Sequence, residues 1–345
     1  MKQVKLGDKW VGDKTPVYFV AEIGGNFKTV EKGVWLIDAA VRVGLDAVKL
    51  QTFEAETITT KKAMFNLEVT GYVPQYEVFK KSEPPKELQR AVFEHARSKG
   101  VTIYSAPSHM KDLEFMEELG VPIYKIGSDL ACHIPLLREV AQTGKPIILS
   151  TGMCTLEEVQ ESVETIDTAG AGDRLIMLHC VSNYPTKHHE ANLRVIPTMK
   201  EAFGLPVGWS DHTLGTEVSL AAVALGANMV ERHFTYDKTA DGPDHILSLT
   251  EEEYRQLIET VRAVEPALGH GRKVPSSSEE EHRLTNRVGI VTLVDIPAGT
   301  IITEEMVDVR RPGNGIAPKH WDEVLGWRAS RNLEAEEPLH WEDLA

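Results

Sequence analysis

Short apolar runs alternate with longer amphipathic segments along most of the chain. The segments between the runs, such as 34–44, 86–100 and 156–170, have the apolar spacing of amphipathic helices, and several end in the glycine expected after a helix. The runs that predict strands cover residues 17–22, 47–52, 102–106, 123–127, 146–151, 175–180, 206–210 and 229–233. Strands that alternate with helices predict a parallel sheet, and eight repeats predict a (β/α)8 TIM barrel of the α/β class.

A doubly wound α/β sheet is the alternative architecture for such a pattern. Sheets of that kind often bind nucleotides through a GxGxxG or GxxxxGK[ST] loop where a strand leads into a helix. Neither loop occurs at a predicted strand–helix turn of this chain, and this favours the barrel.

The pattern changes after the last predicted helix, near residue 269. Residues 273–287 are polar, rich in Ser and Glu and without periodicity, so they are predicted to form a linker. Residues 288–345 contain short β segments and predict a small β-rich domain that follows a barrel spanning residues 1–272. About sixty residues is marginal for a domain that folds alone, so we expect it to dock on a barrel, its own or a partner's.

Composition limits the class of protein to which this chain can belong and the cell compartment in which it is expected. The chain has 345 residues and a formal net charge of −15, and this argues against non-specific binding to nucleic acid. No apolar run is long enough to cross a bilayer, and the first residues lack the apolar core of a signal peptide, so a cytoplasmic protein without a membrane partner is expected. Cys132, Cys154 and Cys180 are odd in number and contain no CxxC pair, so we expect buried thiols, without a disulfide framework or a cysteine zinc site.

The ends of the predicted strands are unusually polar, and the active sites of TIM barrels lie at these carboxyl ends. The polar residues are Glu22, Lys49 with Gln51, Ser105 with Ser108, Lys125 with Ser128, Ser150 with Thr151, His179 with Ser182 and Tyr184, Ser210 with His212, and Glu231 with His233. Two lysines and several hydroxyls around one mouth predict a site for a small phosphorylated or carboxylated anion. An unpaired buried lysine is costly, so we expect the ligand to be the counter-charge of Lys125.

Two histidines end neighbouring predicted strands and are separated by a helix. Adjacent parallel strands lie about 4.8 Å apart, so His212 and His233 can reach one metal ion. Asp211, Glu231 and Asp244 flank the pair and favour a metal site over the alternative, two structural histidines.

The motifs of the chain, taken in order, resemble those of the sialic acid synthase (N-acetylneuraminate synthase) family, and the last domain resembles its antifreeze-like SAF domain. The motifs are Ala21-Glu22-Ile23-Gly24 with Asn26, Lys49-Leu50-Gln51-Thr52, Gln75-Tyr76-Glu77, Lys125-Ile126-Gly127-Ser128, Ser150-Thr151-Gly152-Met153, Leu178-His179-Cys180, Ser182-Asn183-Tyr184-Pro185-Thr186, Ser210-Asp211-His212-Thr213, Glu231-Arg232-His233-Phe234-Thr235 and Gly242-Pro243-Asp244-His245. The resemblance implies a phosphoenolpyruvate-dependent condensing enzyme. It also implies a homodimer in which the SAF tail of one subunit closes the barrel of the other.

The resemblance implies a role for each matching residue. His212 and His233 would hold a divalent ion, usually Mn²⁺, with Mg²⁺ or Co²⁺ as alternatives. Phosphoenolpyruvate would lie against Lys49, Lys125, Ser128, Ser150, Ser182 and Ser210, with Glu22 nearby to position or deprotonate a water molecule. The second substrate would be an open-chain N-acetylated hexosamine that contacts Gln51, Tyr184, Asp244 and Arg311 of the partner subunit.

Three positions depart from the family pattern: Phe27 follows Asn26 in place of a histidine, Leu130 replaces an acidic residue after Ser128-Asp129, and Ala106 replaces a hydroxyl residue. Asp129 is a candidate to replace the missing acid. The acceptor stays open between N-acetylmannosamine, a 2,4-diacetamido-hexose that leads to legionaminic- or pseudaminic-type acids, and a 6-phosphorylated sugar. A non-catalytic carbohydrate-binding protein built on a decayed barrel is the alternative from another class.

Overall fold

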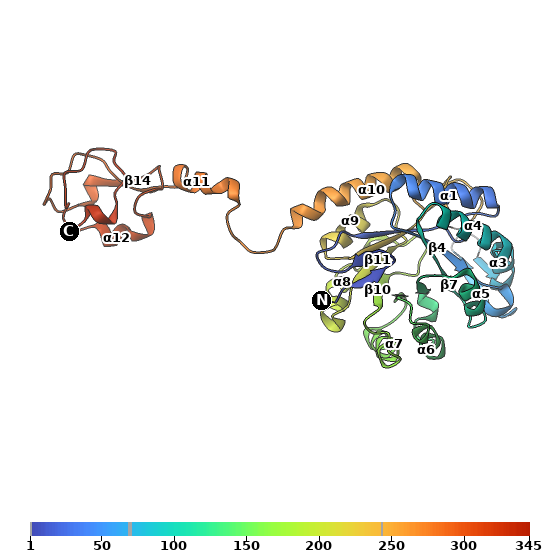
Figure 1. Cartoon of the computed structure of the whole chain (residues 1–345). Coiled ribbons are helices and arrows are strands. Elements are labelled where there is room, and N and C mark those ends of the chain that lie inside the picture. The colour runs from blue at the N-terminus through green and yellow to red at the C-terminus, as the bar shows by residue number, and fades with distance from the viewer. Residues whose placement is uncertain (1, 68–70, 243) are drawn as a thin grey trace. The chain divides into compact units, whose positions relative to one another are not determined.

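The computed structural model describes residues 2–67, 71–242 and 244–345, so Pro243 of the Gly242–His245 motif lies outside the described residues. The chain forms two compact units, Met1–Gly269 and His270–Ala345, which are described separately (Figure 1). The first unit contains the barrel and the second the β-rich tail. The predicted boundaries at residues 272 and 288 stay predictions.

Within the described residues, eight parallel strands close into a barrel in the order β10-β11-β12-β3-β4-β7-β8-β9, and this confirms the predicted TIM barrel. The strands are β3 (Tyr18–Glu22), β4 (Ala47–Thr52), β7 (Thr102–Pro107), β8 (Tyr124–Ile126), β9 (Ile147–Ser150), β10 (Leu175–Cys180), β11 (Val207–Asp211) and β12 (Met229–His233). Each coincides with one of the eight predicted runs. The register sets Glu22 beside both Lys49 on β4 and His233 on β12, so polar strand ends share one rim.

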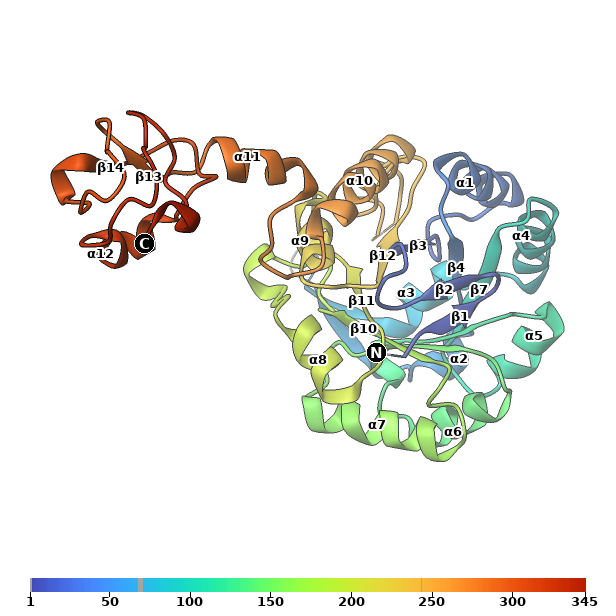
Figure 2. The same ribbon diagram turned by 60° about the vertical axis from the view of Figure 1, so that its left-hand side comes forward.

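The barrel strands are enclosed by a ring of helices (Figure 2). These are α1 (Val30–Val43), α4 (Lys86–Ser98), α5 (Asp112–Leu119), α6 (Ile134–Gln142), α7 (Leu156–Thr168), α8 (Val195–Phe203), α9 (Glu217–Ala224) and α10 (Glu251–Val264). Local signals explain their ends. The Thr29 hydroxyl caps the start of α1, and Gly44 ends it with a φ of 80°, which favours glycine. Thr250 and Glu253 form a capping box that starts α10.

The amino-terminal end of the barrel is closed by a hairpin that the apolar pattern did not predict. Its strands are β1 (Val4–Leu6) and β2 (Lys9–Val11). Val4, Leu6 and Val11 pack with side chains from inside the barrel, such as Tyr104 and Met229, in one buried cluster. Apolar side chains fill this end in the part of the chain that the structure describes, so the site is expected at the carboxyl ends of the strands.

A second unpredicted excursion lies between β4 and α4. It contains α2 (Ala55–Ile58), the antiparallel strands β5 (Met64–Leu67) and β6 (Gly71–Pro74), and α3 (Gln75–Ser82). The ring of Phe79 packs against Phe53 and Phe65, with ring centres 5.7 and 5.6 Å apart. These elements are too short to give a clear period, although they supply two side chains to the cavity described below.

The second unit has its own apolar core. Its elements are η4 (Ser277–Glu279), α11 (Glu280–Thr285), β13 (Gly289–Thr292), β14 (Val307–Arg310) and α12 (Trp321–Val324). Ile290, Ile302, Val307 and Leu339 are among its fully buried residues. The segment predicted as a linker without regular structure therefore contains the short helix α11, whose acidic first turn and basic last turn suit the helix dipole.

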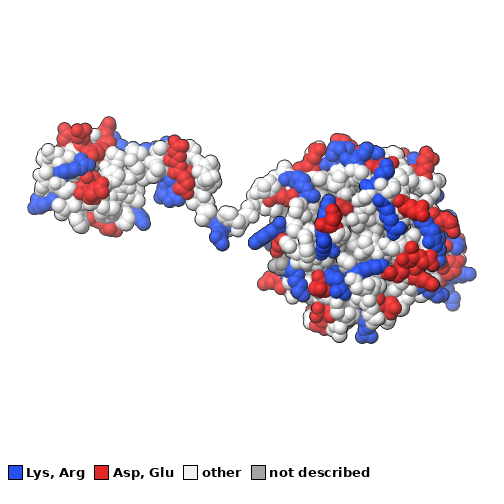
Figure 3. Space-filling view, in the orientation of Figure 1, with Lys and Arg blue, Asp and Glu red and all other residues white. Residues whose placement is uncertain are grey.

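On the face drawn in Figure 3, basic and acidic side chains are interspersed over both units. No helix of the described residues is long and apolar enough to cross a bilayer. The expectations that the protein is cytoplasmic and binds no nucleic acid stay predictions.

Candidate active site

A cavity of about 290 Å³ opens at the carboxyl ends of the barrel strands. Among the described residues, its lining includes ten predicted site residues: Lys49, Gln51, Lys125, Ser128, Ser150, Ser182, Tyr184, Ser210, His212 and His233. They come from strands β4, β8, β9, β10, β11 and β12 or from the connections that follow, so residues as far apart in the chain as Lys49 and His233, 184 positions, meet in one space.

The two lysines of the cavity are held by carboxylates inside the barrel. Lys125 Nζ lies 2.5 Å from Glu231 Oε1, and Lys49 Nζ lies 3.5 Å from the same oxygen. Lys49 also forms an ion pair with Glu22. The expectation that Lys125 lacks a protein counter-charge is therefore wrong. Glu231 is two residues before His233 on β12, so both side chains point into the barrel, where Glu231 reaches across to β8.

This cluster of two lysines and two glutamates shifts the proton equilibria of its members. Burial opposes ionisation of Glu231, but the neighbouring Lys125 and Lys49 ammonium groups hold its pKa below the usual range. Burial lowers the pKa of Lys49 to about 8, despite the attraction of Glu231. Glu231 Oε2 has no hydrogen-bond partner among the described residues, so it is free to accept a bond from a substrate or water.

The two histidines lie side by side at the cavity wall. Their ring centres are 5.5 Å apart, and the Tyr184 ring stacks on His212 with its centre 4.1 Å away. His212 Nδ1 is 2.8 Å from the Val181 carbonyl oxygen. Since a carbonyl oxygen only accepts, Nδ1 carries the proton and the lone pair is on Nε2. Burial lowers the pKa of His212 to about 4, so the ring is neutral at physiological pH.

These features fit a divalent metal ion. His233 Nδ1 is buried without a hydrogen-bond partner among the described residues, and Asp244 Oδ2 lies 3.7 Å from it. Two neutral imidazoles with free lone pairs and a nearby carboxylate are the donors that such ions use in catalytic sites. Burial raises the pKa of Asp244 to about 6, partly offset by Lys49.

Small donors form another wall of the cavity. The Gly152 amide donates a 3.0 Å hydrogen bond to Ser128 Oγ, which also contacts Cys180 Sγ at 3.1 Å. A Cβ atom on Gly152 would come within 2.5 Å of Ser182 Oγ and 2.8 Å of Ser128 Oγ. Glycine at this position therefore leaves room for hydroxyl groups that can surround an anion.

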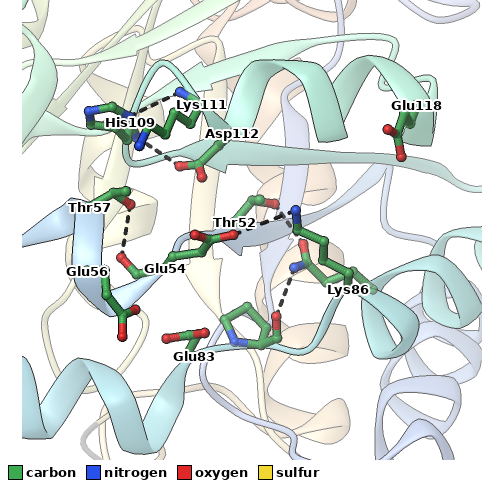
Figure 4. Close-up of polar contacts among 12 residues, drawn as sticks. Thr52, Glu54, Glu56, Thr57, Glu83, Lys86, His109, Lys111, Asp112 and Glu118 are labelled. Carbon is green, nitrogen blue, oxygen red and sulfur yellow. Dashed lines mark hydrogen bonds and ion pairs between the residues drawn. The ribbon is translucent and has the colours of Figure 1, made fainter.

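The rim next to α5 is held by hydrogen bonds outside the cavity (Figure 4). The amides of Ser108 and His109 donate to Asp112 Oδ2 at 2.9 and 2.8 Å, and Ser108 lines the cavity. Ser105, predicted at the mouth with Ser108, instead contacts Thr52 Oγ1 at 2.7 Å and is buried. Asp112 thus positions the Ser108 backbone, and Ser105 supports the strand.

Of the residues to which the family resemblance gives a role, Glu22, Asp244 and Arg311 do not line this cavity. Glu22 is buried and pairs with Lys49, and Asp244 Oδ2 lies 3.7 Å from His233 Nδ1. Arg311 belongs to the second unit, directly after β14. Its predicted place over the barrel of a partner stays a prediction.

The departures from the family pattern have distinct places. Phe27 packs in the core beside Gly33 of α1, and Leu130 packs against the same core. Asp129 and Ala106 both line the cavity. The cavity therefore does receive a carboxylate after Ser128, from Asp129.

Sequence reasoning listed Glu231 among the polar strand ends and beside the histidines, but gave it no role in binding or catalysis. The period-2 alternation of β12 was the available signal, because it puts Glu231 and His233 on one face. The same rule puts Asp211 and Arg232 on the outer face, where they form a fully buried ion pair of 2.7 Å. Asp211, which favoured the metal site in the sequence, is thus part of the scaffold.

Comparisons with known proteins agree with this geometry. The NeuB family matches residues 36–273, and the SAF domain matches residues 287–345. The N,N′-diacetyllegionaminic acid synthase of Legionella pneumophila is 37% identical, over 98% of this chain and 97% of that protein. The pseudaminic acid synthase of Campylobacter jejuni is 34% identical, over 95% of this chain and 96% of that protein.

A solved structure of a related enzyme is also similar to this chain. The crystal structure of N-acetylneuraminic acid (sialic acid) synthetase from Leptospira borgpetersenii matches with a TM-score of 0.73 and 31% identity, over 81% of this chain and 95% of that chain. Enzymes of the NeuB family generally use a divalent metal ion, which suits the donors around His212 and His233. The chain belongs to the NeuB family, carries an SAF domain at its C-terminal end, and is a phosphoenolpyruvate-condensing transferase of the nonulosonic acid synthase type.

Proposed function

We propose that the protein condenses phosphoenolpyruvate with an open-chain N-acetylated hexosamine to give a nonulosonic (sialic-type) acid and inorganic phosphate. The observation that carries the proposal is the convergence of Lys49 and Lys125 with His212 and His233 in one cavity. Two cations suit the phosphate and carboxylate of phosphoenolpyruvate, and two neutral imidazoles suit a metal ion beside an aldehyde.

Lys49 and Lys125 bind the anionic groups of phosphoenolpyruvate and stabilise the departing phosphate. Each ammonium has three donors, of which the carboxylates Glu22 and Glu231 use only part. The hydroxyls of Ser128, Ser150, Ser182 and Ser210 add short donors around the same anion. Ser210 also donates to Glu231 Oε1 at 3.0 Å, and this orients the carboxylate.

His212 Nε2 and His233 would hold the divalent ion, for which we propose Mn²⁺, with Mg²⁺ or Co²⁺ as alternatives. When bound, the ion supplies a Lewis acid that polarises the aldehyde oxygen of the acceptor. The Val181 carbonyl keeps the His212 ring in the tautomer that this role requires.

The carbon–carbon bond forms between C3 of phosphoenolpyruvate and the aldehyde carbon, and water then adds at C2 before the C–O bond to phosphate breaks. Glu22, our first candidate for the base, contacts Lys49 and lies outside the cavity lining, so the geometry favours a positioning role. Glu231 lines the cavity and has a free Oε2. We assign Glu231 Oε2 as the acceptor that orients the attacking water.

The acceptor would contact Gln51, Tyr184 and Asp244, together with Arg311 of the partner subunit in a domain-swapped homodimer. Tyr184 suits this position because it is half exposed at the cavity and stacks on His212. A 2,4-diacetamido-hexose is the second acceptor candidate, favoured by the 37% identity to a legionaminic acid synthase. The complete set of charged residues in the cavity favours catalysis over the alternative, a decayed sugar-binding barrel.

A screen of acceptors tests the proposal. Purified protein with Mn²⁺ and phosphoenolpyruvate is offered N-acetylmannosamine, its 6-phosphate and 2,4-diacetamido-hexoses, and phosphate release and the nine-carbon product are measured. We expect release that depends on one class of acceptor and is lost in Lys125→Ala. Release that is equal with and without any acceptor, or no release with all of them, contradicts the proposal.

A further inference from the structure

Two cysteines lie together beside the active-site cavity. Cys132 is in the connection between β8 and α6, and Cys154 is in the connection between β9 and α7. Cys132 is exposed, Cys154 is half-buried and Cys180 is buried, so the expectation of three buried thiols is wrong for two of them. Because the two cysteines lie 22 positions apart in the chain, no short spacing motif reveals the pair.

A carboxylate completes this group. The sulfurs of Cys132 and Cys154 and a carboxylate oxygen of Glu158 all lie within 4.8 Å of one another, and none belongs to the cavity lining. In a tetrahedral site with metal–ligand bonds of about 2.0–2.3 Å, ligand atoms are roughly 3.3–3.8 Å apart. Small side-chain rotations would therefore bring the three atoms to bonding distance of one ion.

The Glu158 carboxylate is already oriented. Its Oε2 accepts a 2.7 Å hydrogen bond from the Thr155 amide, and the Thr155 hydroxyl accepts from the Glu158 amide in a capping box at the start of α7. Hydrogen bonds of this kind hold ligating carboxylates in place in metal sites. Helix α7 thus presents Glu158 toward Cys154, which is one residue before the cap.

Against the expectation that the cysteines form no zinc site, we propose that Cys132, Cys154 and Glu158 form a binding site for a thiophilic divalent cation such as Zn²⁺ or Cd²⁺, separate from the histidine site. Two thiolates select soft or borderline metals, whereas the histidine and carboxylate donors of the cavity also suit Mn²⁺. Each thiol releases a proton when it binds the ion, and three protein ligands leave a fourth position for water.

The site would connect to the cavity through the backbone. Cys132 is four residues after Ser128, and Cys154 is two residues after Gly152, whose amide donates to Ser128 Oγ. Binding of an ion would fix the two connections against each other, next to the wall that we assign to the phosphoenolpyruvate anion.

Cadmium titration of the reduced, chelator-treated protein tests the site. The ultraviolet charge-transfer band between thiolate and Cd²⁺ reports sulfur ligands alone, so the histidine site does not contribute. We expect one Cd²⁺ with this band per chain, and loss of the band in Cys132→Ser and in Cys154→Ser. Glu158→Gln should keep the band and weaken binding about tenfold or more.

Two variants serve as matched controls. Cys180→Ser removes the third thiol, and Glu161→Gln removes an exposed carboxylate from the same helix. Both should keep the band and the affinity of the wild type, and circular dichroism should show that every variant is folded. Absence of the band in the wild type, or a band that survives both Cys132→Ser and Cys154→Ser, overturns the proposal.

Discussion

The inner and the outer face of strands β11 and β12 each carry a group of buried ionisable side chains. The two groups differ in how many of their polar atoms have a hydrogen-bond partner within the protein. On the outer face, Asp211 accepts hydrogen bonds from Arg232, Ser219 and Thr213. Arg232 also donates to three backbone carbonyls, so that only its Nε lacks a hydrogen-bond partner among the described residues. On the inner face, Glu231 Oε2 and His233 Nδ1 have no hydrogen-bond partner among the described residues and stand beside a cavity.

The difference separates scaffold from site on the same two strands. A buried charge whose hydrogen bonds are mostly made within the protein holds elements together, because breaking it leaves an uncompensated partner. A buried polar atom left free beside a cavity costs stability unless a ligand completes it. Loss of a residue on the outer face should therefore lower the free energy of unfolding, and loss of a residue on the inner face should lower the rate of condensation.

Removal of the metal should give the largest effect on the inner face. His212→Ala, or chelation of the wild type, should lower the condensation rate about a thousandfold, because a Lewis acid contributes several kcal/mol. Mn²⁺ should restore the chelated wild type but not the variant, as measured by phosphate release. Thermal unfolding of His212→Ala should stay close to that of the wild type; undiminished turnover without metal contradicts the assignment.

Loss of the outer ion pair should act on stability. Arg232→Met leaves Asp211 buried without its cation, and the expected loss in the free energy of unfolding is about 3–5 kcal/mol. Denaturant unfolding measures it. Arg255→Met is the control, since Arg255 pairs with Glu251 at the surface of α10 and should change stability by less than about 1 kcal/mol. An equal loss of unfolding free energy in Arg232→Met and Arg255→Met would contradict a special structural role for the buried ion pair on the outer face.

Arg311 tests whether the inner face is completed by a second subunit. Its planar guanidinium suits a sugar amide or hydroxyls, so Arg311→Ala should raise the KM for the sugar about 10–100-fold and the KM for phosphoenolpyruvate far less. Equal effects on both substrates would indicate a structural turn.

A mixture of inactive subunits tests the domain swap itself. When Lys125→Ala and Arg311→Ala subunits exchange, a hybrid dimer has one site with an intact barrel and an intact partner arginine, so part of the activity should return. Persistent inactivity after demonstrated exchange refutes the swapped arrangement and leaves the proposed chemistry standing.

The pH profile should show the smallest effect. Burial lowers the pKa of Lys49 to about 8, so the ammonium loses its proton at a lower pH than an ordinary lysine. Above pH 8, kcat/KM for phosphoenolpyruvate should fall about tenfold per pH unit. Lys49→Arg stays charged in this range, so its profile should be flat there even if its activity is lower. The same alkaline decline in that variant would assign the decline to another group.

Much of the fold and of the site was predictable from the sequence. The strands and helices follow from the local pattern of apolar residues, and the place of the site follows from a rule that holds for TIM barrels in general. The short apolar runs and the amphipathic segments between them predicted all eight barrel strands, and the rule that TIM-barrel sites lie at strand ends brought Lys49, Lys125, His212 and His233 together. The hairpins β1–β2 and β5–β6 were missed, since their short strands (VKL, KWV, MFNL and GYVP) mix apolar with other residues and do not stand out as apolar runs.

The sequence by itself determined which residue types stand at the strand ends, because alternation along a strand is a local property. Only the tertiary structure decided which of them meet. Closure of the barrel brings Glu231 to Lys125, which is 106 positions away in the chain. It also places Cys132 near Cys154, because the connections that carry them follow neighbouring strands. Closure also put Asp211 and Arg232 outside the cavity. Such contacts depend on strand order, register and side-chain reach across the barrel, which no short window of sequence contains.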